Sequence, residues 1–322
     1  MVNATISSLG VPNAGALDGT FATDNALFRD QFAGEVLTAF EMATVFADKH
    51  LVRSITSGKS ASFPATWKAT ARYHTAGTPI VGSNQIEHNQ RIINIDNLLI
   101  SDVFIDDLQA AKNHYDVRSI YSNELGIALA KEYDSNVARV ILLASRANAT
   151  TTSGNGGSKV SNAAAKTDGE ILAGLIFDAN QALDEKDVPE GERYAAVKPA
   201  QYYLMAQTTK LLNKDWGGSG VYADGEIHKV GGTSLIKTNN LPSTNIASAT
   251  AGTMNTYHGN FSTVAAAVWR KEAAGTVKLM DLAMEMSGAD FHIMYQGDMM
   301  VGKYSVGHGI LRPECAVEVA TS

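Results

Sequence analysis

The longest unbroken pattern of hydrophobic and polar positions lies between residues 116 and 148. Its apolar side chains recur in steps of three and four, at Val117, Ile120/Tyr121, Leu125, Ala128/Leu129, Tyr133, Val137 and Val140/Ile141. This spacing puts them on one face of an α-helix, and Asp116 is a good N-cap because its carboxylate can accept from the first-turn N–H groups. We expect a helix over 116–147, roughly 45 to 50 Å long at 1.5 Å per residue. That length exceeds the width of a compact domain and predicts an extended architecture.

Two different patterns precede this helix. The first 24 residues are rich in Gly, Ala, Asn and Ser, so we expect a mobile arm. From Asn25, large apolar residues recur at helical spacing and predict an amphipathic helix that ends near Lys49. Residues 51–91 instead alternate, are rich in β-branched and aromatic side chains, and are punctuated by Gly and Pro. They predict a long β-hairpin loop with too little apolar surface for a core of its own, so it must pack on something else.

The second half of the chain reads as an α/β unit followed by strands. A flexible connector, TTTSGNGGSKVSNAAAK, is a candidate domain boundary. The run Thr167–Glu170 predicts a capping box and a helix that stops before Pro189. A buried strand over 194–198 and a helix from Pro199 to near Leu212 follow, and then strands in IHKV, SLIK and FSTVAAAVW.

The last fifty residues return to a strand pattern, in TVKLMDLAME, DFHIMYQ, MMVGKYSVGHGIL and CAVEVA, and residues 91–108 also read as strands. We expect the sheet of these segments to pack against the long helix. The chain would then leave one domain, build a second and return to close the first. The fold class is therefore α+β.

Composition and charge narrow the function. With 322 residues and 45% hydrophobic content the chain can bury a core, and its net charge of -7 argues against a protein whose task is tight binding to phosphate backbones. Residues 49–91 are nevertheless basic, with Glu87 as their one acidic residue, whereas residues 184–192 (DEKDVPEGE) are acidic. A basic arm on an acidic body fits nucleic-acid binding, and it fits equally well the docking of one copy's arm on the next copy's surface.

Targeting and redox signals are weak. The N-terminus lacks a basic region followed by an apolar run, so we expect neither a signal nor a transit peptide. No window approaches 18 uncharged apolar residues, so we expect no membrane association. Cys315, the single cysteine, fits a reducing compartment and is expected to pack as a small apolar residue.

Catalytic chemistry has little support in the sequence. No two histidines have a metal-ligand spacing, and there is no nucleophile elbow, P-loop or dinucleotide fingerprint. His308 lies between Gly307 and Gly309, where a base near a ligand is possible but glycines in a strand more often permit a bulge or a close backbone approach. We therefore expect no catalytic residue, cofactor or metal. The alternative is a soluble α/β enzyme that uses His308 and Glu314.

Aromatic and basic side chains interleave in the predicted hairpin. Such a pattern is found on single-stranded nucleic-acid surfaces, but in an acidic protein we favour a hairpin whose aromatic face rests on another subunit. The predicted inter-subunit contacts are Arg53, Lys59, Phe63, Trp67, Lys68, Arg72 and Tyr73.

Several motifs carry a resemblance that spans nearly the whole chain. GEVLTAF at 34–40, HLVRSITSGKSASFP at 50–64, NHYDVRSIYSNELGIALA at 113–130, GTVKLMDLAME at 275–285 and KYSVGHGILRPE at 303–314 occur in that order. In order and spacing they resemble the major capsid proteins of short-tailed, podovirus- or autographivirus-type double-stranded DNA phages.

The resemblance implies the tailed-phage major capsid (Johnson) fold. Its parts would be an N-terminal arm and helix at 1–50, an extended loop at 51–91, a peripheral domain at 92–166 with the spine helix, an axial domain at 167–265, and peripheral return strands at 266–322. Some members of the wider fold weld subunits through a Lys–Asn bond, for which Lys59 and Lys68 lie in the right region, but we do not assign that chemistry.

The resemblance also implies a function and partners. Proteins of this family form pentamers and hexamers of an icosahedral shell, assemble with a scaffolding protein around a portal, and expand as double-stranded DNA is packaged. The expected location is the virion, after assembly in the host bacterial cytoplasm, with weak non-specific contact to the DNA. A cellular encapsulin-type compartment would share the fold and is the third alternative.

Overall fold

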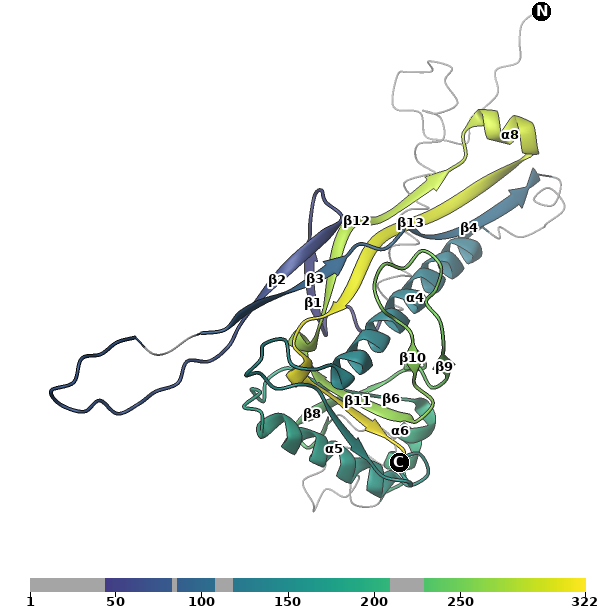
Figure 1. Ribbon diagram of the computed structural model, residues 1–322. Coiled ribbons are helices and arrows are strands. Elements are labelled where there is room, and N and C mark those ends of the chain that lie inside the picture. Colours follow the sequence, from purple (N-terminus) through teal and green to yellow (C-terminus); the bar gives the residue numbers. More distant parts are fainter. Residues whose placement is uncertain (1–43, 83–85, 108–117, 209–228) are drawn as a thin grey trace, which may run out of the picture. The chain divides into compact units, whose positions relative to one another are not determined.

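The computed structural model describes residues 44–82, 86–107, 118–208 and 229–322 (Figure 1). Helices and sheets both occur in this part of the chain, as the predicted α+β class requires. It forms two compact units: the first contains Leu98–Tyr133 and Met280–Ser305, and the second contains Val45–Asn97, Asp134–Leu279 and Val306–Ser322. The predicted mobile arm at 1–24 lies outside the described residues. So does the predicted helix from Asn25 up to residue 43, and residues 44–50 form bends and turns rather than its end.

The long helix is confirmed as α4, which covers Arg118–Arg146. Its 29 residues correspond to about 43 Å. Leu125, Leu129, Tyr133, Val137 and Ile141 recur every four residues and are all buried, as the sequence pattern predicted. None of the helices among the described residues combines the length and the apolar character needed to cross a membrane.

In the first unit, one face of α4 packs on paired strands. β4 (Leu99–Asp106) runs antiparallel to the start of β13 (Gly297–Ile310). The sheet has the order β1-β12-β13-β4, and its strand β1 belongs to the second unit. Leu125 and Met300 form its core with half-buried Val103, Leu282 and other apolar chains. The rings of Tyr133 and Tyr304 lie 5.9 Å apart. The predicted packing of returning strands on the long helix is therefore present here.

The segment DFHIMYQ is not a strand. It lies in the short helix α8 (Ala289–Tyr295), which connects β12 (Ala274–Met286) to β13 and ends where Gln296 adopts a left-handed φ of 51°. The prediction was wrong because a seven-residue apolar run with alternating aromatic and polar positions satisfies both periodicities. His292 stabilises this connection, with its ring nitrogens 3.1 Å from the carboxylates of Asp107 and Asp298.

The second unit is built on a six-stranded sheet of order β5-β14-β11-β6-β8-β7. Its central strands are β11 (Val264–Arg270), β6 (Arg193–Val197) and β14 (Ala316–Ala320), and nearly all their residues are buried. The outer strands are β5 (Ser158–Ser161), β8 (Thr233–Lys237) and β7 (Lys229–Val230), and a separate small pair is formed by β9 (Asn245–Ile246) and β10 (Gly259–Asn260). β14 thus pairs with β11, so the last fifty residues divide between two sheets instead of forming one.

Two helices accompany this sheet. α5 (Gly169–Asp184) contacts β14 and β5, and α6 (Pro199–Ala206) packs against α5. α6 begins at its proline as predicted but ends earlier than Leu212. The capping box was predicted one residue too early: the Asp168 carboxylate accepts from the N–H groups of Glu170 and Ile171, while the Thr167 hydroxyl donates to the Ala164 carbonyl.

The described residues between 51 and 94 contain three strands. β1 (Leu51–Ser54) pairs in parallel with β12, so it is not part of the predicted hairpin. β2 (Ser60–Thr66) and β3 (His88–Asn94) form the antiparallel pair, from Ser60↔Asn94 to Thr66↔His88. The long-range parallel partner of β1 has no local sequence signal, which explains the error.

Candidate inter-subunit surface

The outer part of the predicted extended loop, called the loop from here on, is described at residues 67–82 and 86–87 and projects from the β2–β3 pair (Figure 1). The Trp67 N–H donates to the Glu87 carbonyl at 3.0 Å and extends the pairing by one rung. Beyond it, a turn is closed by the Thr78 N–H and hydroxyl, which both donate to the Thr75 carbonyl, and Gly77 takes a φ of 87° that favours glycine. The described residues of the loop between these points form no strand.

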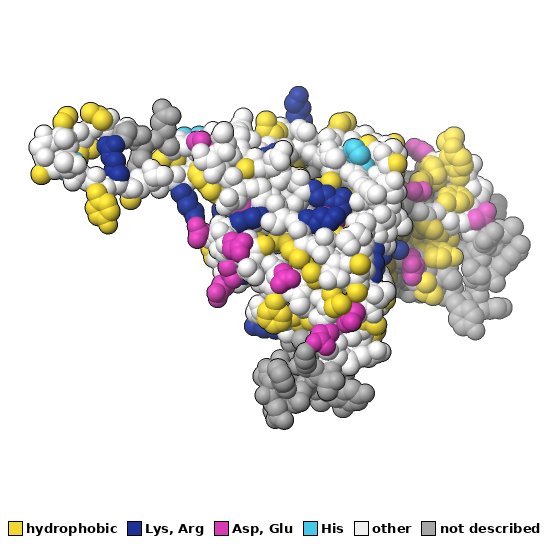
Figure 2. All heavy atoms as spheres, turned by 60° about the horizontal axis from the view of Figure 1, so that its bottom comes forward, with side chains coloured by type: hydrophobic (Ala, Val, Ile, Leu, Met, Phe, Trp, Pro, Cys, Tyr) yellow, Lys and Arg dark blue, Asp and Glu magenta, His cyan; other side chains and the backbone are white. Residues whose placement is uncertain are grey.

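The large apolar side chains near this turn are exposed. Tyr73 has a relative exposure of 104%, Ile80 of 75% and Val81 of 74%. In Figure 2 the loop carries hydrophobic and Lys or Arg side chains, and acidic side chains gather beside its base. Exposed apolar side chains that cluster on one segment indicate an interaction surface.

The seven predicted contact residues occupy three parts of this region. The guanidinium of Arg53, on β1, donates to the Ser62 carbonyl at 3.2 Å and lies 5.6 Å from the centre of the Phe63 ring, so these two residues are brought together. Lys59 is exposed in the β1–β2 connection, and Trp67 is half-buried at the start of the loop. Lys68, Arg72 and Tyr73 are exposed in the loop itself.

Lys68 has a partner in its own chain. Its ammonium group lies 2.8 Å from the carboxylate of Asp187, in the acidic run 184–192. The Lys68 hydrogen bond holds the pKa of Asp187 below its usual range. Both side chains are largely exposed, so solvent screens this ion pair. At Lys68, the expected attraction between the basic loop and the acidic run 184–192 therefore joins two parts of the same chain and not two copies.

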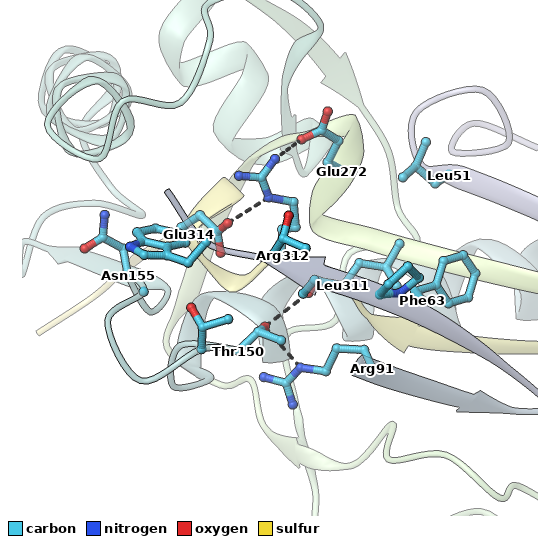
Figure 3. Close-up of a pocket in the computed structure, with 15 residues that line it drawn as sticks. Leu51, Phe63, Arg91, Thr150, Asn155, Glu272, Leu311, Arg312 and Glu314 are labelled. Carbon is cyan, nitrogen blue, oxygen red and sulfur yellow. Dashed lines mark hydrogen bonds and ion pairs between the residues drawn. The ribbon is translucent and has the colours of Figure 1, made fainter. Parts of the chain in front are cut away.

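A hollow of about 350 Å³ opens at the base of the loop (Figure 3). Its lining comes from β1, β2, β3 and the start of the loop, from the connector after α4, from the turn before β12 and from the segment between β13 and β14. Apolar lining is supplied by Leu51, Phe63, Pro64, Trp67 and Leu311. The polar lining includes Arg91, Thr150, Asn155, Glu272, Arg312 and Glu314.

The polar groups of the hollow hold one another in place. The Arg312 guanidinium donates to Glu314 at 2.7 Å and to Glu272 at 2.6 Å (Figure 3). Arg91 donates to the Thr150 hydroxyl at 3.2 Å, and that hydroxyl reaches the Leu311 carbonyl at 3.3 Å. Arg312 therefore joins two carboxylates and positions the segment that precedes β14.

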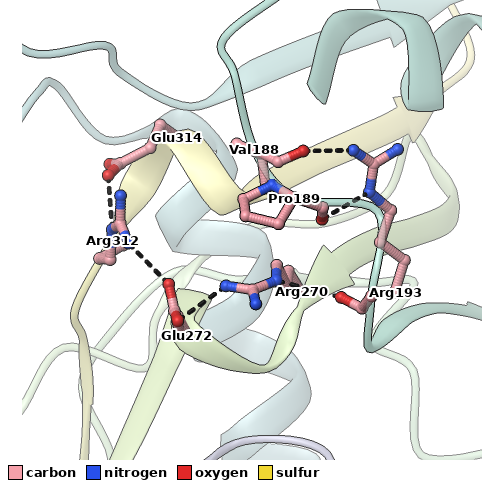
Figure 4. Close-up of polar contacts among 8 residues, drawn as sticks. Val188, Pro189, Arg193, Arg270, Glu272, Arg312 and Glu314 are labelled. Carbon is pink, nitrogen blue, oxygen red and sulfur yellow. Dashed lines mark hydrogen bonds and ion pairs between the residues drawn. The ribbon is translucent and has the colours of Figure 1, made fainter. Parts of the chain in front are cut away.

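This network continues into the acidic run. Arg270 pairs with Glu272 at 2.7 Å and donates to the Gly191 carbonyl at 3.0 Å (Figure 4). Arg193 is almost fully buried and donates to the carbonyls of Val188 and Pro189. Residues 188–191 are thus fixed beside the hollow by two arginines.

His308 lies in a buried polar cluster. The Thr276 hydroxyl is 2.8 Å from His308 Nδ1 and 2.8 Å from His50 Nε2, while His50 Nδ1 is 2.8 Å from the Phe46 carbonyl. Burial lowers the pKa of His50 to about 4 and that of His308 to about 3. With both rings neutral, His50 donates to Phe46 and accepts from Thr276, and Thr276 in turn accepts from His308.

The glycines beside His308 have the structural role that the sequence favoured. A Cβ at Gly307 would lie 1.9 Å from the Asn94 carbonyl oxygen, and one at Gly309 would lie 2.6 Å from Ile93. His308 also donates its backbone N–H to the Tyr257 hydroxyl at 2.9 Å. Close backbone approach therefore explains the Gly-His-Gly sequence.

The alternative hypothesis of an enzyme that uses His308 and Glu314 is not supported. Glu314 is engaged by Arg312, whereas His308 is buried with Thr276, so the two have separate partners. Cys315 is buried, and burial raises the pKa of its thiol to about 12, as expected for a packing residue. Within the described ranges, no cluster of His, Cys, Asp and Glu has the arrangement of a metal site.

Comparison with known proteins identifies the family. Residues 62–320 match the Gp10A-like family of major capsid proteins, well over half of the chain. The chain belongs to this family. It is 34% identical over 316 residues to the major capsid protein of Escherichia phage T7, covering 90% of each chain. It is 33% identical over 326 residues to the major capsid protein of Enterobacteria phage T3, covering 92% of each.

Solved capsids share the fold of this major capsid protein. The capsid of cyanophage P-SCSP1u has a TM-score of 0.79 and 45% identity, over 100% of this chain and 99% of that one. The mature capsid of phage PhiM1 has a TM-score of 0.71 and 18% identity, over 87% of each chain. A virus-like particle from Pyrococcus furiosus has a TM-score of 0.57 and 14% identity, over 91% and 99%, and shows the fold alone. The predicted tailed-phage capsid fold is confirmed.

Sequence reasoning did not find the hollow of this capsid protein. Arg91, Thr150 and Arg312 come from three distant segments, and each looks ordinary in its own context. The Gly-rich run after α4 was interpreted as a flexible connector, although its Asn155 and Gly154 line the hollow. The one available signal was the density of small polar residues there, which are common where a loop approaches other backbone segments.

Proposed function

We propose that this chain is the structural subunit of a phage shell, in which pentamers and hexamers tile an icosahedral surface around double-stranded DNA. The observation that carries the proposal is the match to phage major capsid proteins over nine tenths of both chains. The loop supports it, because Tyr73, Ile80 and Val81 are exposed together at its end, and a cluster of exposed apolar side chains is typical of an interaction surface.

The predicted division of the chain is part of this proposal. Residues 1–50 would be the arm, 51–91 the extended loop, 92–166 and 266–322 the peripheral domain, and 167–265 the axial domain. The six-stranded sheet supports a separate axial body, although β5, β14 and most of β11 in that sheet lie outside 167–265. The first unit supports a peripheral body built on the front half of α4.

The loop would contact a neighbouring copy. Arg53, Lys59, Phe63, Trp67, Lys68, Arg72 and Tyr73 all lie in or beside the loop and its supporting strands. Aromatic and Arg side chains dominate the binding energy of protein interfaces, so Trp67, Arg72 and Tyr73 should contribute most. Lys68 would contribute less, because Asp187 of its own chain already binds it.

Further partners follow from the family. Assembly would take place in the bacterial cytoplasm on a scaffolding protein around a portal, and the finished protein would reside in the virion. Contact with packaged DNA would be weak and non-specific, in keeping with the net charge of -7. The virus-like particle neighbour supplies no reason to prefer a cellular compartment, because that likeness is limited to the fold.

Particle formation tests the proposal. The purified chain is expressed with and without a scaffolding protein and followed by light scattering and negative-stain electron microscopy. We expect megadalton, closed particles with local five- and six-fold clusters. A small, discrete oligomer under both conditions would overturn the proposal and would suit an enzyme instead.

A further inference from the structure

The hollow at the base of the loop has the properties of a receptor for a side chain. Its volume of about 350 Å³ is at the lower end of ligand pockets. Phe63, Pro64 and Leu311 give it an apolar lining, and the Arg312 guanidinium is already held between Glu272 and Glu314. Since these charges are paired, an apolar group with one polar end suits the hollow better than a free ion does.

The tip of the loop offers such a group. Tyr73 lies just before the Thr75–Thr78 turn and Ile80 lies just after it, both exposed. Tyrosine combines a rigid apolar ring with a hydroxyl that can reach a polar rim. Because Tyr73 is fully exposed, the hollow of its own chain does not hold it.

Charge complementarity favours a meeting of these two surfaces. Residues 67–82 contain Lys68 and Arg72 and no carboxylate. The hollow itself is balanced in charge, because Arg91 and Arg312 line it together with Glu272 and Glu314. Beside it lies the acidic run 184–192, held by the bond from Arg270, the partner of Glu272, to the Gly191 carbonyl. A basic tip that enters the hollow would therefore be attracted by this acidic run.

We propose that this hollow receives the loop tip of a second copy of the chain, with Tyr73 as the side chain that enters it. The inference rests on the proposed shell function. Tip and hollow are different patches of the same chain, so the contact is head-to-tail, and its repetition closes a ring when the rotation between successive copies returns to the first copy. The rings would be the pentamers and hexamers of the shell.

Disulfide trapping tests this placement. The only native cysteine, Cys315, is buried, so engineered cysteines can be followed cleanly. Particles of a Tyr73→Cys/Asn155→Cys variant are oxidised and run on a non-reducing gel. We expect a ladder of covalent products of up to six copies, at least tenfold stronger than in a Tyr73→Cys/Phe177→Cys control. Phe177 is exposed on α5 and does not line the hollow.

The outcomes separate this inference from the proposed function. Normal particles with no more ladder than the control would overturn the placement of Tyr73 and leave the shell function standing. Absence of particles from the unaltered chain would instead remove the shell function.

A second pair of variants decides the matter if the double-cysteine chain fails to assemble. Tyr73→Phe keeps the ring and loses only the hydroxyl, so it should reduce particle yield far less than Tyr73→Ser, which should lose at least tenfold with unchanged circular dichroism. Equal yields for both would overturn the proposal.

Discussion

The six-stranded sheet and the extended loop belong to the same compact unit, but the sheet buries its large apolar side chains and the loop exposes them. In β11, Trp269 is fully buried, its ring lies 5.5 Å from Phe46 and 5.8 Å from Tyr194, and its N–H donates to the Lys49 carbonyl. In the loop, Tyr73 has no such surroundings. The sheet buries its apolar side chains within one copy, whereas those of the loop are exposed in one copy and, in the proposed shell, would be buried against another. Substitutions in the two regions should therefore affect different properties.

The largest difference should come from removing one aromatic ring in each region. Trp269→Ala leaves a cavity among buried rings and should lower the free energy of unfolding of the unassembled subunit by about 3–5 kcal/mol. Tyr73→Ser, the matched change in the loop, should stay within about 0.5 kcal/mol. Urea unfolding followed by circular dichroism measures both. A similar loss for the two variants would mean that the loop packs on its own chain.

Acid should destabilise the fold through the buried cluster of His50, Thr276 and His308 and not through the exposed loop. His50 has a folded pKa of about 4, well below its unfolded value of 6.5, so the unfolded chain binds more protons between these pH values. The contribution of His50 to the free energy of unfolding is thus fully present above pH 6.5. It is lost as the pH drops towards 4, and the loss amounts to about 3 kcal/mol. His308 adds a loss in the same direction.

Urea unfolding between pH 7 and pH 4.5 measures this slope. His50→Gln should be less stable at neutral pH and should show a flatter decline. His74→Gln, in the exposed loop, should decline in parallel with the unaltered chain. Parallel slopes for all three proteins would show that His50 is not held neutral by burial.

Charge reversal at Lys59, in the β1–β2 connection, and at Arg72, in the loop, should leave folding unchanged and impair assembly. Lys59→Glu/Arg72→Glu alters exposed positions, so the free energy of unfolding should change by less than about 0.5 kcal/mol. Particle yield should fall, because reversed charges would face an acidic neighbour. A Lys159→Glu/Lys229→Glu variant carries the same change in charge on exposed residues outside the loop. If both variants form particles equally well by electron microscopy, the loop's charge does not contribute to docking.

Features with a local signal were predicted well, and features that depend on distant segments were not. The 3.6-residue pattern found α4 and its end to within one residue, while the predicted start at Asp116 lies outside the described residues, and Pro199 correctly marked the start of α6. The pairing of β1 with β12 joins residues more than 200 positions apart, which no local pattern encodes. The same holds for the cluster of His50, Thr276 and His308 and for the hollow around Arg312, since both exist only after the strands have paired.

The smallest expected effect concerns Lys68, which lies in the loop but forms an ion pair with Asp187 of the acidic run. In the unassembled subunit, Lys68→Gln removes the bond that depresses the pKa of Asp187, so that pKa should rise towards its ordinary value. Overall stability should not change measurably, because both side chains are exposed to water and screened. A carboxyl-carbon NMR titration of Asp187 measures the shift, and Lys59→Gln serves as a control with the same loss of charge. If Lys68→Gln leaves the pKa of Asp187 unchanged, the base of the loop is not held to the acidic run in solution. Lys68 would then be available to a neighbouring copy, and the boundary between the self-contained body and the partner-dependent loop would move to Trp67.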